Sequence, residues 1–217
     1  MKKAFAFLTV AALSLGIANA QLGINAGYAP QTYTTTVSDN DPTTDNLDGF
    51  FVGVGYNQSI AKGINVSVGL QGRYNTASGS NSVNLGILGN STANWESSQM
   101  LIDVPVLFNY GFDLNDGVRV SLFLGPVVSY ALNGKTSWTA DANVLSFLNL
   151  GTNGEDNWYE DGDNRNKMDL GGTAGVCVTF NQFRLFGGYN QGLLNLSTAD
   201  NTTLKGSNWF IGLGYAL

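Results

Sequence analysis

Hydropathy alternates with a period of two along most of the chain. Within residues 64–75, for example, Ile64, Val66 and Val68 alternate with polar residues or glycine. Successive side chains of a strand point to opposite faces, so this pattern predicts strands with one apolar and one polar face. The predicted strands are residues 22–30, 50–59, 64–75, 98–110, 118–132, 168–180, 183–191 and 205–217. Several reach the roughly 9–11 residues that a tilted strand needs to cross a bilayer.

The connections between these strands fall into two classes. The short ones are residues 61–63, 111–117 and 181–182, and the long, polar ones are 31–49, 76–97, 133–167 and 192–204. Long and short connections alternate strictly, as in outer-membrane barrels with short periplasmic turns and long extracellular loops. We therefore predict an all-β fold, an eight-stranded antiparallel up-and-down transmembrane β-barrel with both termini in the periplasm.

Alternation alone does not decide which face of the barrel points outward. A soluble lipocalin-like barrel would place its polar face in water. The polar face here is mainly Gly, Asn, Ser and Gln, and only 12% of all residues are charged, about half the usual share. The apolar face carries Tyr110 and Tyr215 at one end and Tyr74 and Trp209 at the other, like an aromatic girdle. Both features favour a membrane barrel.

The two ends of the chain indicate export and membrane assembly. Lys2 and Lys3, the apolar run 4–17 and the small residues 18–20 are typical of a signal peptide. We expect residues 1–20 to be cleaved and residues 21–217 to form the barrel, because the apolar run is short for a helical anchor of about 20 residues. The alternating apolar residues of 209–217 resemble the signal that the barrel-assembly machinery reads. Outer-membrane lipid and lipopolysaccharide would surround the folded barrel.

The few charged residues predict a filled interior. Counting by alternation, four of them face the lumen: Arg73, Asp103, Arg119 and Arg184. An eight-stranded barrel is just wide enough for side chains to fill it, and buried charges need partners. We therefore expect a packed polar core, with a narrow gated conduit as the alternative. The sequence does not indicate which charges pair.

The overall charge and one acidic segment bear on binding. Without Lys2 and Lys3, 8 basic residues stand against 16 acidic ones, which argues against a nucleic-acid partner. The acidic loop contains Glu155, Asp156, Glu160, Asp161 and Asp163. Clustered carboxylates suit Ca²⁺, but the EF-hand spacing is missing. We interpret the segment as a solvated loop, with a weak divalent-cation site touching lipopolysaccharide phosphates as the alternative.

The residue inventory argues against an enzyme. The chain contains no histidine, so hydrolytic mechanisms with a Ser–His or Asp–His base are excluded. No phosphate-binding loop or metal-ligand motif is present, and no cofactor is expected. We expect a structural or interaction role, in which the loops meet a surface protein or glycan. Binding or narrow transport of a small solute is the alternative.

The second half of the chain resembles the PorT-like outer-membrane β-barrels of Bacteroidetes. The stretches that carry the likeness are Leu101-Ile102-Asp103-Val104-Pro105-Val106-Leu107, Phe123-Leu124-Gly125-Pro126-Val127-Val128-Ser129-Tyr130, Met168-Asp169-Leu170-Gly171 and Tyr189-Asn190-Gln191-Gly192-Leu193-Leu194-Asn195-Leu196. The resemblance implies a small eight-stranded barrel like OmpX or OmpA. It implies little about activity, although the family name also suggests an association with protein secretion.

Two prolines of these stretches are unusual for strand interiors. Pro105 and Pro126 fall in the middle of neighbouring predicted strands. Proline cannot donate to the ladder, so we expect a β-bulge or a local opening near them.

Overall fold

The computed structural model describes residues 20–38, 40–84, 90–115, 117–140, 153–160 and 165–217. The strands are β1 (Ala20–Tyr28), β2 (Gln31–Val37), β3 (Thr43–Ala61), β4 (Ile64–Asn84), β5 (Asn90–Asn115), β6 (Val118–Ala140), β7 (Asn153–Asn157), β8 (Met168–Phe180), β9 (Phe183–Gly192) and β10 (Thr202–Ala216). In these ranges, no helix is long and apolar enough to cross a membrane. The predicted signal peptide lies almost entirely outside them.

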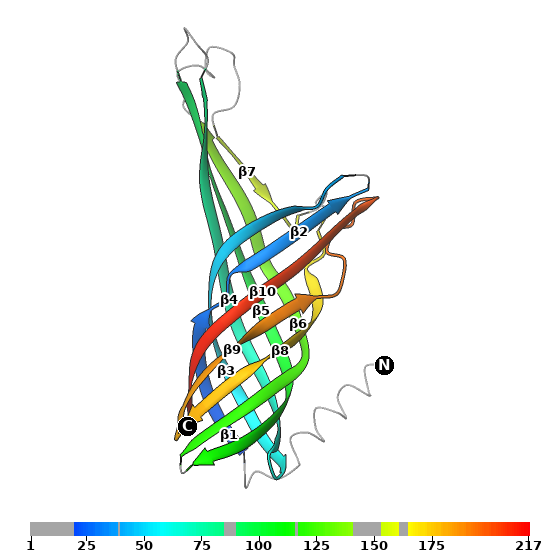
Figure 1. Ribbon diagram of the computed structural model, residues 1–217. Coiled ribbons are helices and arrows are strands. Elements are labelled where there is room, and N and C mark those ends of the chain that lie inside the picture. Colours follow the sequence, from blue (N-terminus) through cyan, green and yellow to red (C-terminus); the bar gives the residue numbers. More distant parts are fainter. Residues whose placement is uncertain (1–19, 39, 85–89, 116, 141–152, 161–164) are drawn as a thin grey trace.

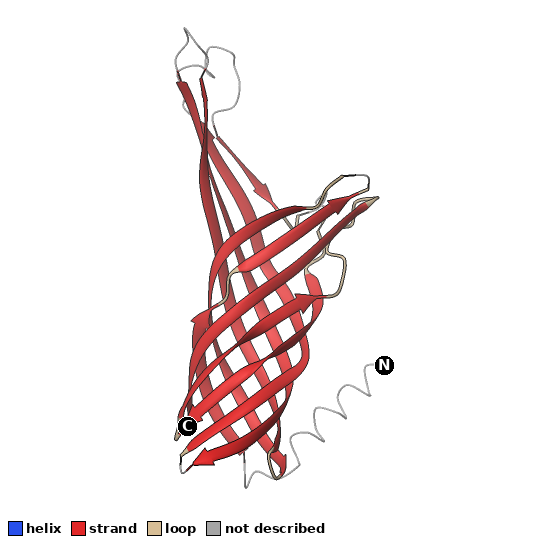
Figure 2. Ribbon diagram, viewed as in Figure 1, coloured by secondary structure: helices blue, strands red, loops and turns tan. Residues whose placement is uncertain are grey.

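The strands close into one antiparallel barrel (Figures 1 and 2). β1 and β2 together occupy one strand position of the barrel, because both pair with β3 on one side and β10 on the other. We call each such strand position a stave. Between β1 and β2, Ala29 keeps its bond to the neighbouring strand, its N–H donating to the Gly49 carbonyl at 2.8 Å. Counted this way, the described strands form eight staves, and β7 extends the sheet beside β6. The predicted up-and-down barrel is confirmed.

The outer face carries a band of exposed apolar side chains between two aromatic edges. At the end with the long connections, Tyr28, Phe50 and Tyr74 lie opposite one another on consecutive staves, and Tyr28 also contacts Trp209. At the short-turn end, Tyr215 packs edge-on against Phe183, with ring centroids 5.2 Å apart. Between these edges the exposed residues include Val52, Val54, Leu70, Leu122, Leu124, Leu185 and Leu213. Such a band matches the lipid-facing surface of a membrane barrel.

The strands extend further than the sequence predicted at the long-connection end, which we call the loop end. Residues 76–97 and much of 31–49 and 133–140 were expected to be loops, but they continue β2–β6 well beyond the aromatic edge (Figure 1). The β4–β5 ladder runs as far as Asn84 and Asn90. Beyond the lipid band neither face needs apolar residues, so the alternation ends while Ser- and Thr-rich segments still pair as strands.

The short connections form tight turns at the opposite end, which we call the turn end. β5 continues to Asn115, so the predicted turn at 111–117 is shorter than expected. Gly63 and Gly117 have φ of 81° and 86°, a backbone conformation that glycine adopts without steric cost. Ala216 pairs alongside Gly23, so the described N-terminal part and the C-terminus lie at this same end.

The two strand prolines open the ladder locally without shifting its register. Between β4 and β5, pairing stops after Val68–Val106 and resumes at Gln71–Asp103, on either side of Pro105. Between β5 and β6, it is interrupted beside Pro126 and again resumes in the same register. The expected local opening is confirmed, and the two register shifts between β5 and β6 occur elsewhere, at Met100–Leu101 and at Asp113–Asn115.

Candidate functional site in the barrel interior

The centre of the barrel is occupied by a buried network around Arg73. The Arg73 Nε atom lies 3.0 Å from the Asp103 carboxylate, and both residues are only 4% exposed. The guanidinium also donates to Gln31 Oε1 at 2.6 Å and to Asn208 Oδ1 at 3.0 Å. These partners come from β2, β5 and β10, so one side chain of β4 ties together strands from opposite walls. The buried charge is thereby paired and hydrogen-bonded, as its stability requires.

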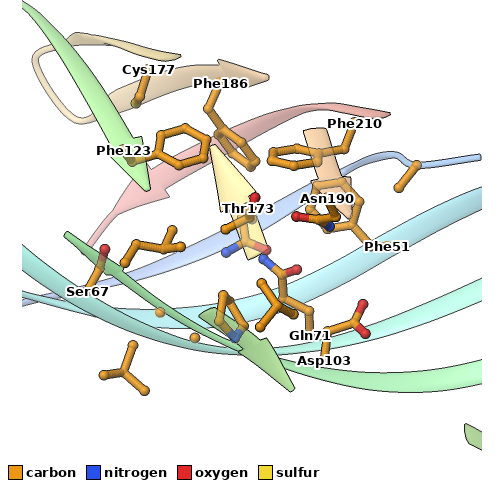
Figure 3. A pocket seen from close by; sticks show the side chains of 18 of the residues that line it. Phe51, Ser67, Gln71, Asp103, Phe123, Thr173, Cys177, Phe186, Asn190 and Phe210 are labelled. Atoms are coloured by element: carbon orange, nitrogen blue, oxygen red, sulfur yellow. The ribbon is translucent and has the colours of Figure 1, made fainter. Parts of the chain in front are cut away.

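A cluster of four phenylalanines fills the interior next to this network. Phe51, Phe186, Phe210 and Phe123 contact one another in that order, with ring centroids 6.1–6.3 Å apart. A cavity of about 130 Å³ remains between aromatic and polar walls. In Figure 3, Phe123, Phe186 and Phe210 lie on one side of it, and Ser67, Gln71 and Asp103 on the other.

Some polar atoms of the cavity wall make the space suitable for water. Asn25 Oδ1 and Thr173 Oγ1 are buried and have no hydrogen-bond partner among the described residues. A polar cavity of this size can hold water molecules bonded to such atoms.

At the loop end, an apolar cluster closes the interior. It consists of Tyr33, Leu47, Trp158, Leu196 and Leu204, with Ala77 and Tyr159 packed against it. The Tyr33 hydroxyl donates to Gln99 at 2.7 Å, and Gln99 in turn donates to the Tyr159 hydroxyl at 2.6 Å. Burial raises the pKa of Tyr33, so this hydroxyl stays protonated and remains a donor. Only a cavity of about 40 Å³ separates this cluster from the Arg73 network.

The other two predicted lumen charges lie at the turn end. Arg119 is partly exposed and forms a 3.5 Å ion pair with Asp113, whose side chain is largely exposed. Arg184 packs across Gly23 and Gly214, where an added Cβ at Gly23 would lie 2.5 Å from its guanidinium. Both arginines line a wide mouth of about 580 Å³, and neither contacts Arg73 or Asp103 in the interactions described above.

The described carboxylates of the acidic segment do not converge on one point. Glu155 forms a 2.8 Å ion pair with Lys135, and both side chains are about half exposed. This bond raises the pKa of Lys135. Asp156 faces the loop-end cavity, and Glu160 accepts a hydrogen bond from Asn157. Asp161 and Asp163 lie outside the described residues, and among the described ones no group of three His, Cys, Asp or Glu could hold a metal ion.

The alternation of the sequence places Arg73 and Asp103 on the inner face but does not pair them. The missing information was the β4–β5 register, in which Gln71 lies opposite Asp103 and Arg73 is its diagonal neighbour. The alternation does not reveal Gln31, which lies in a segment expected to be a loop, and it does not single out Gln99, although Gln99 shares the inward parity of Asp103 in a predicted strand. The inward parity of Asn208, two residues before Phe210 on β10, was the one signal that could have found it.

A closed barrel with an apolar band outside and a polar, filled interior defines a transmembrane β-barrel of the outer-membrane type. The chain belongs to the family described as outer membrane protein beta-barrel domain, whose model matches residues 14–198. It is therefore an integral protein of the outer membrane.

Several solved barrels are similar in fold. The attachment invasion locus protein Ail of Yersinia pestis is 16% identical, with a TM-score of 0.41, over 92% of this chain and 99% of Ail. Neisserial surface protein A is 13% identical, with a TM-score of 0.46 over 91% and 98% of the two chains. OprG from Pseudomonas aeruginosa is 10% identical, with a TM-score of 0.44 over 92% and 96%. No curated protein matches the chain significantly.

Proposed function

We propose that this protein is a non-conducting, non-enzymatic barrel that holds an interaction surface rigidly above the outer membrane. The observation that carries the proposal is the filled interior. The Arg73 network, the four phenylalanines and the apolar loop-end cluster occupy successive levels of the barrel. Above them, the strand extensions continue the β-ladders where loops were expected.

The absence of histidine supports the non-enzymatic part of the proposal. Both oxygens of the buried Asp103 carboxylate already contact the Arg73 guanidinium. The asymmetry of the connections supports an orientation with the turn end in the periplasm and the loop end outside. In that orientation the extended strand ends would meet lipopolysaccharide and surface partners, whether protein or glycan.

Solute binding or narrow transport is the second candidate function, and the cavity beside the phenylalanines favours it. A small, partly apolar solute would fit its mixed walls. The motifs around Pro105 and Pro126 support a place among PorT-like barrels, and an association with secretion would follow from that placement.

Electrical recording in planar bilayers separates the two candidates. We expect the purified wild-type protein to give no steady conductance, because the Arg73 network and the apolar loop-end cluster fill the described interior at two levels. Insertion of the protein is checked separately, by heat-modifiable gel mobility of protein recovered from vesicles prepared in the same way. Robust single-channel steps from the wild type would overturn the proposal in favour of transport.

A further inference from the structure

The strand extensions enclose a large cavity at the loop end, which we call the vestibule. Its volume is about 830 Å³, far larger than the interior cavities. The inner faces of β4–β7 form one wall, and those of β2, β3 and β10 form the other. Its floor is the apolar cluster around Trp158, so the vestibule is separated from the barrel interior.

Two tryptophans dominate the taller wall of the vestibule. Trp95 and Trp138 lie directly opposite each other on β5 and β6, and both line the cavity. They are 36% and 42% exposed. Because they lie beyond the aromatic edge and face inward, lipid does not cover them, and large exposed aromatic surface of this kind marks a binding site.

The strands on either side leave room for these indole rings to lie flat. Gly79 of β4 is paired with Trp95, and Gly154 of β7 is paired with Trp138. An added Cβ would lie 2.7 Å from the Trp95 ring at Gly79 and 2.2 Å from the Trp138 ring at Gly154. The rings therefore spread outward over the glycines, and together they form an aromatic platform two to three strand spacings wide, roughly 10–14 Å.

A row of polar groups lies immediately below the platform. Ser97, Thr136 and Asp156 are paired in sequence across β5, β6 and β7. Ser97 and Thr136 are hydrogen-bonded at 2.8 Å, and the Trp158 indole donates to Thr136 at 2.9 Å. Asp45 contributes a second carboxylate from the opposite wall. Flat aromatic surface beside hydroxyls and carboxylates matches a sugar ring, which has an apolar C–H face and a rim of hydroxyl groups.

The charges of the vestibule favour a neutral ligand. Among the described residues that line it, Arg165 is the one cationic side chain. Arg165 is stacked on the floor, with its Cζ atom 4.4 Å from the centroid of the Trp158 ring and 5.8 Å from that of the Tyr33 ring. Asp45 and Asp156 would repel sulfate or phosphate groups, and the chain as a whole is acidic.

We infer that the vestibule binds a neutral oligosaccharide, with Trp95 and Trp138 stacking on its rings and Asp45 and Asp156 accepting its hydroxyls. The width of the platform favours a chain of several sugars over a single one. The inference rests on the proposed function, since it names the class of partner that the loop-end surface would hold.

The test is fluorescence titration of the full-length protein in a zwitterionic detergent, because detergents with sugar headgroups would compete. Three of the four tryptophans line the vestibule, so its occupancy should change the emission. The probes are maltohexaose, cellohexaose and mannohexaose, with a heparin hexasaccharide as the sulfated comparison. We expect at least one neutral hexasaccharide to bind, and the heparin fragment to bind at least tenfold more weakly.

Three variants locate the site, each checked for folding by heat-modifiable gel mobility. Trp95→Ala and Trp138→Ala should each weaken binding at least tenfold. Trp209→Phe, which changes the outer aromatic edge, should leave it unchanged. The inference is overturned if no neutral probe binds at millimolar concentration, if the two alanine variants bind like the wild type, or if the heparin fragment binds best. The proposed function is tested separately by the conductance measurement, whose result does not depend on the titration.

Discussion

Among single residues, Arg73 is the centre of the buried network in the barrel interior. It contacts Asp103, Gln31 and Asn208 at once while almost fully buried. Removing one partner of a buried ion pair typically costs about 3–5 kcal/mol, because the other charge stays buried and unpaired. Replacing both by apolar residues avoids that cost.

A double-mutant cycle should therefore show strong coupling between Arg73 and Asp103. We expect Arg73→Leu or Asp103→Leu alone to lower the free energy of unfolding in lipid vesicles by about 3–5 kcal/mol. The double variant should lose less than the sum of the two single losses. Urea titration followed by gel mobility measures all three, and strictly additive losses would show that the pair is not coupled.

The residues of this network were only partly predictable. Alternation is enough to place Arg73 and Asp103 on the inner face, because parity does not depend on register. Their pairing depends on which residues of β4 and β5 lie opposite, and the hydropathy pattern is unchanged when one strand slides by two positions. Gln31 was not predictable for another reason, since its stave restarts only after Pro30.

Among the strands, β5 and β6 approach each other closely where their ladder is interrupted beside Pro126. A Cβ atom added at Gly125 would lie 1.9 Å from the Val106 carbonyl oxygen. That neighbour is backbone and cannot turn aside. Gly172, which is paired with Pro126 from β8, has no heavy atom within 4 Å of the same added atom.

These two glycines form a matched pair for testing strand packing. Gly125→Ala should destabilise the barrel by about 1–3 kcal/mol, as overpacking does. Gly172→Ala should be neutral or slightly stabilising, because alanine restricts the unfolded chain more than glycine does. Unfolding midpoints in urea compare the two variants, and equal effects would contradict the close approach at Gly125.

Strand ends were less predictable than strand centres. Within the lipid band, the bilayer imposes an apolar outer face, so alternation identified all eight staves. Above it, residues such as Thr76 and Ser97 continue the ladder with no hydropathy pattern to reveal it. The vestibule was not predictable for this reason: the hydropathy pattern assigns Trp95 and Trp138 to loops, although two tryptophans in polar segments are a signal of exposed aromatic surface.

The barrel as a whole consists of two compartments, and the apolar loop-end cluster forms a plug between them. The vestibule opens at the loop end, and the mouth lined by Arg119 and Arg184 opens at the turn end. Cys177, the only cysteine of the chain, lines this mouth and the central cavity. It therefore lies on the turn side of the apolar loop-end cluster.

Labelling of Cys177 with a small, charged thiol reagent tests the closed interior most directly. The protein is reconstituted into vesicles, and reagent is added outside only. Two variants that also carry Cys177→Ala report orientation: Asp41→Cys for an exposed loop end and Lys62→Cys for an exposed turn end. We predict that the fraction of Cys177 that reacts equals the fraction of Lys62→Cys that reacts, because both are reached only where the turn end faces outward. Molecules whose loop end faces outward should not react at Cys177. Equal reaction of Cys177 from both sides would contradict a barrel plugged between its two mouths.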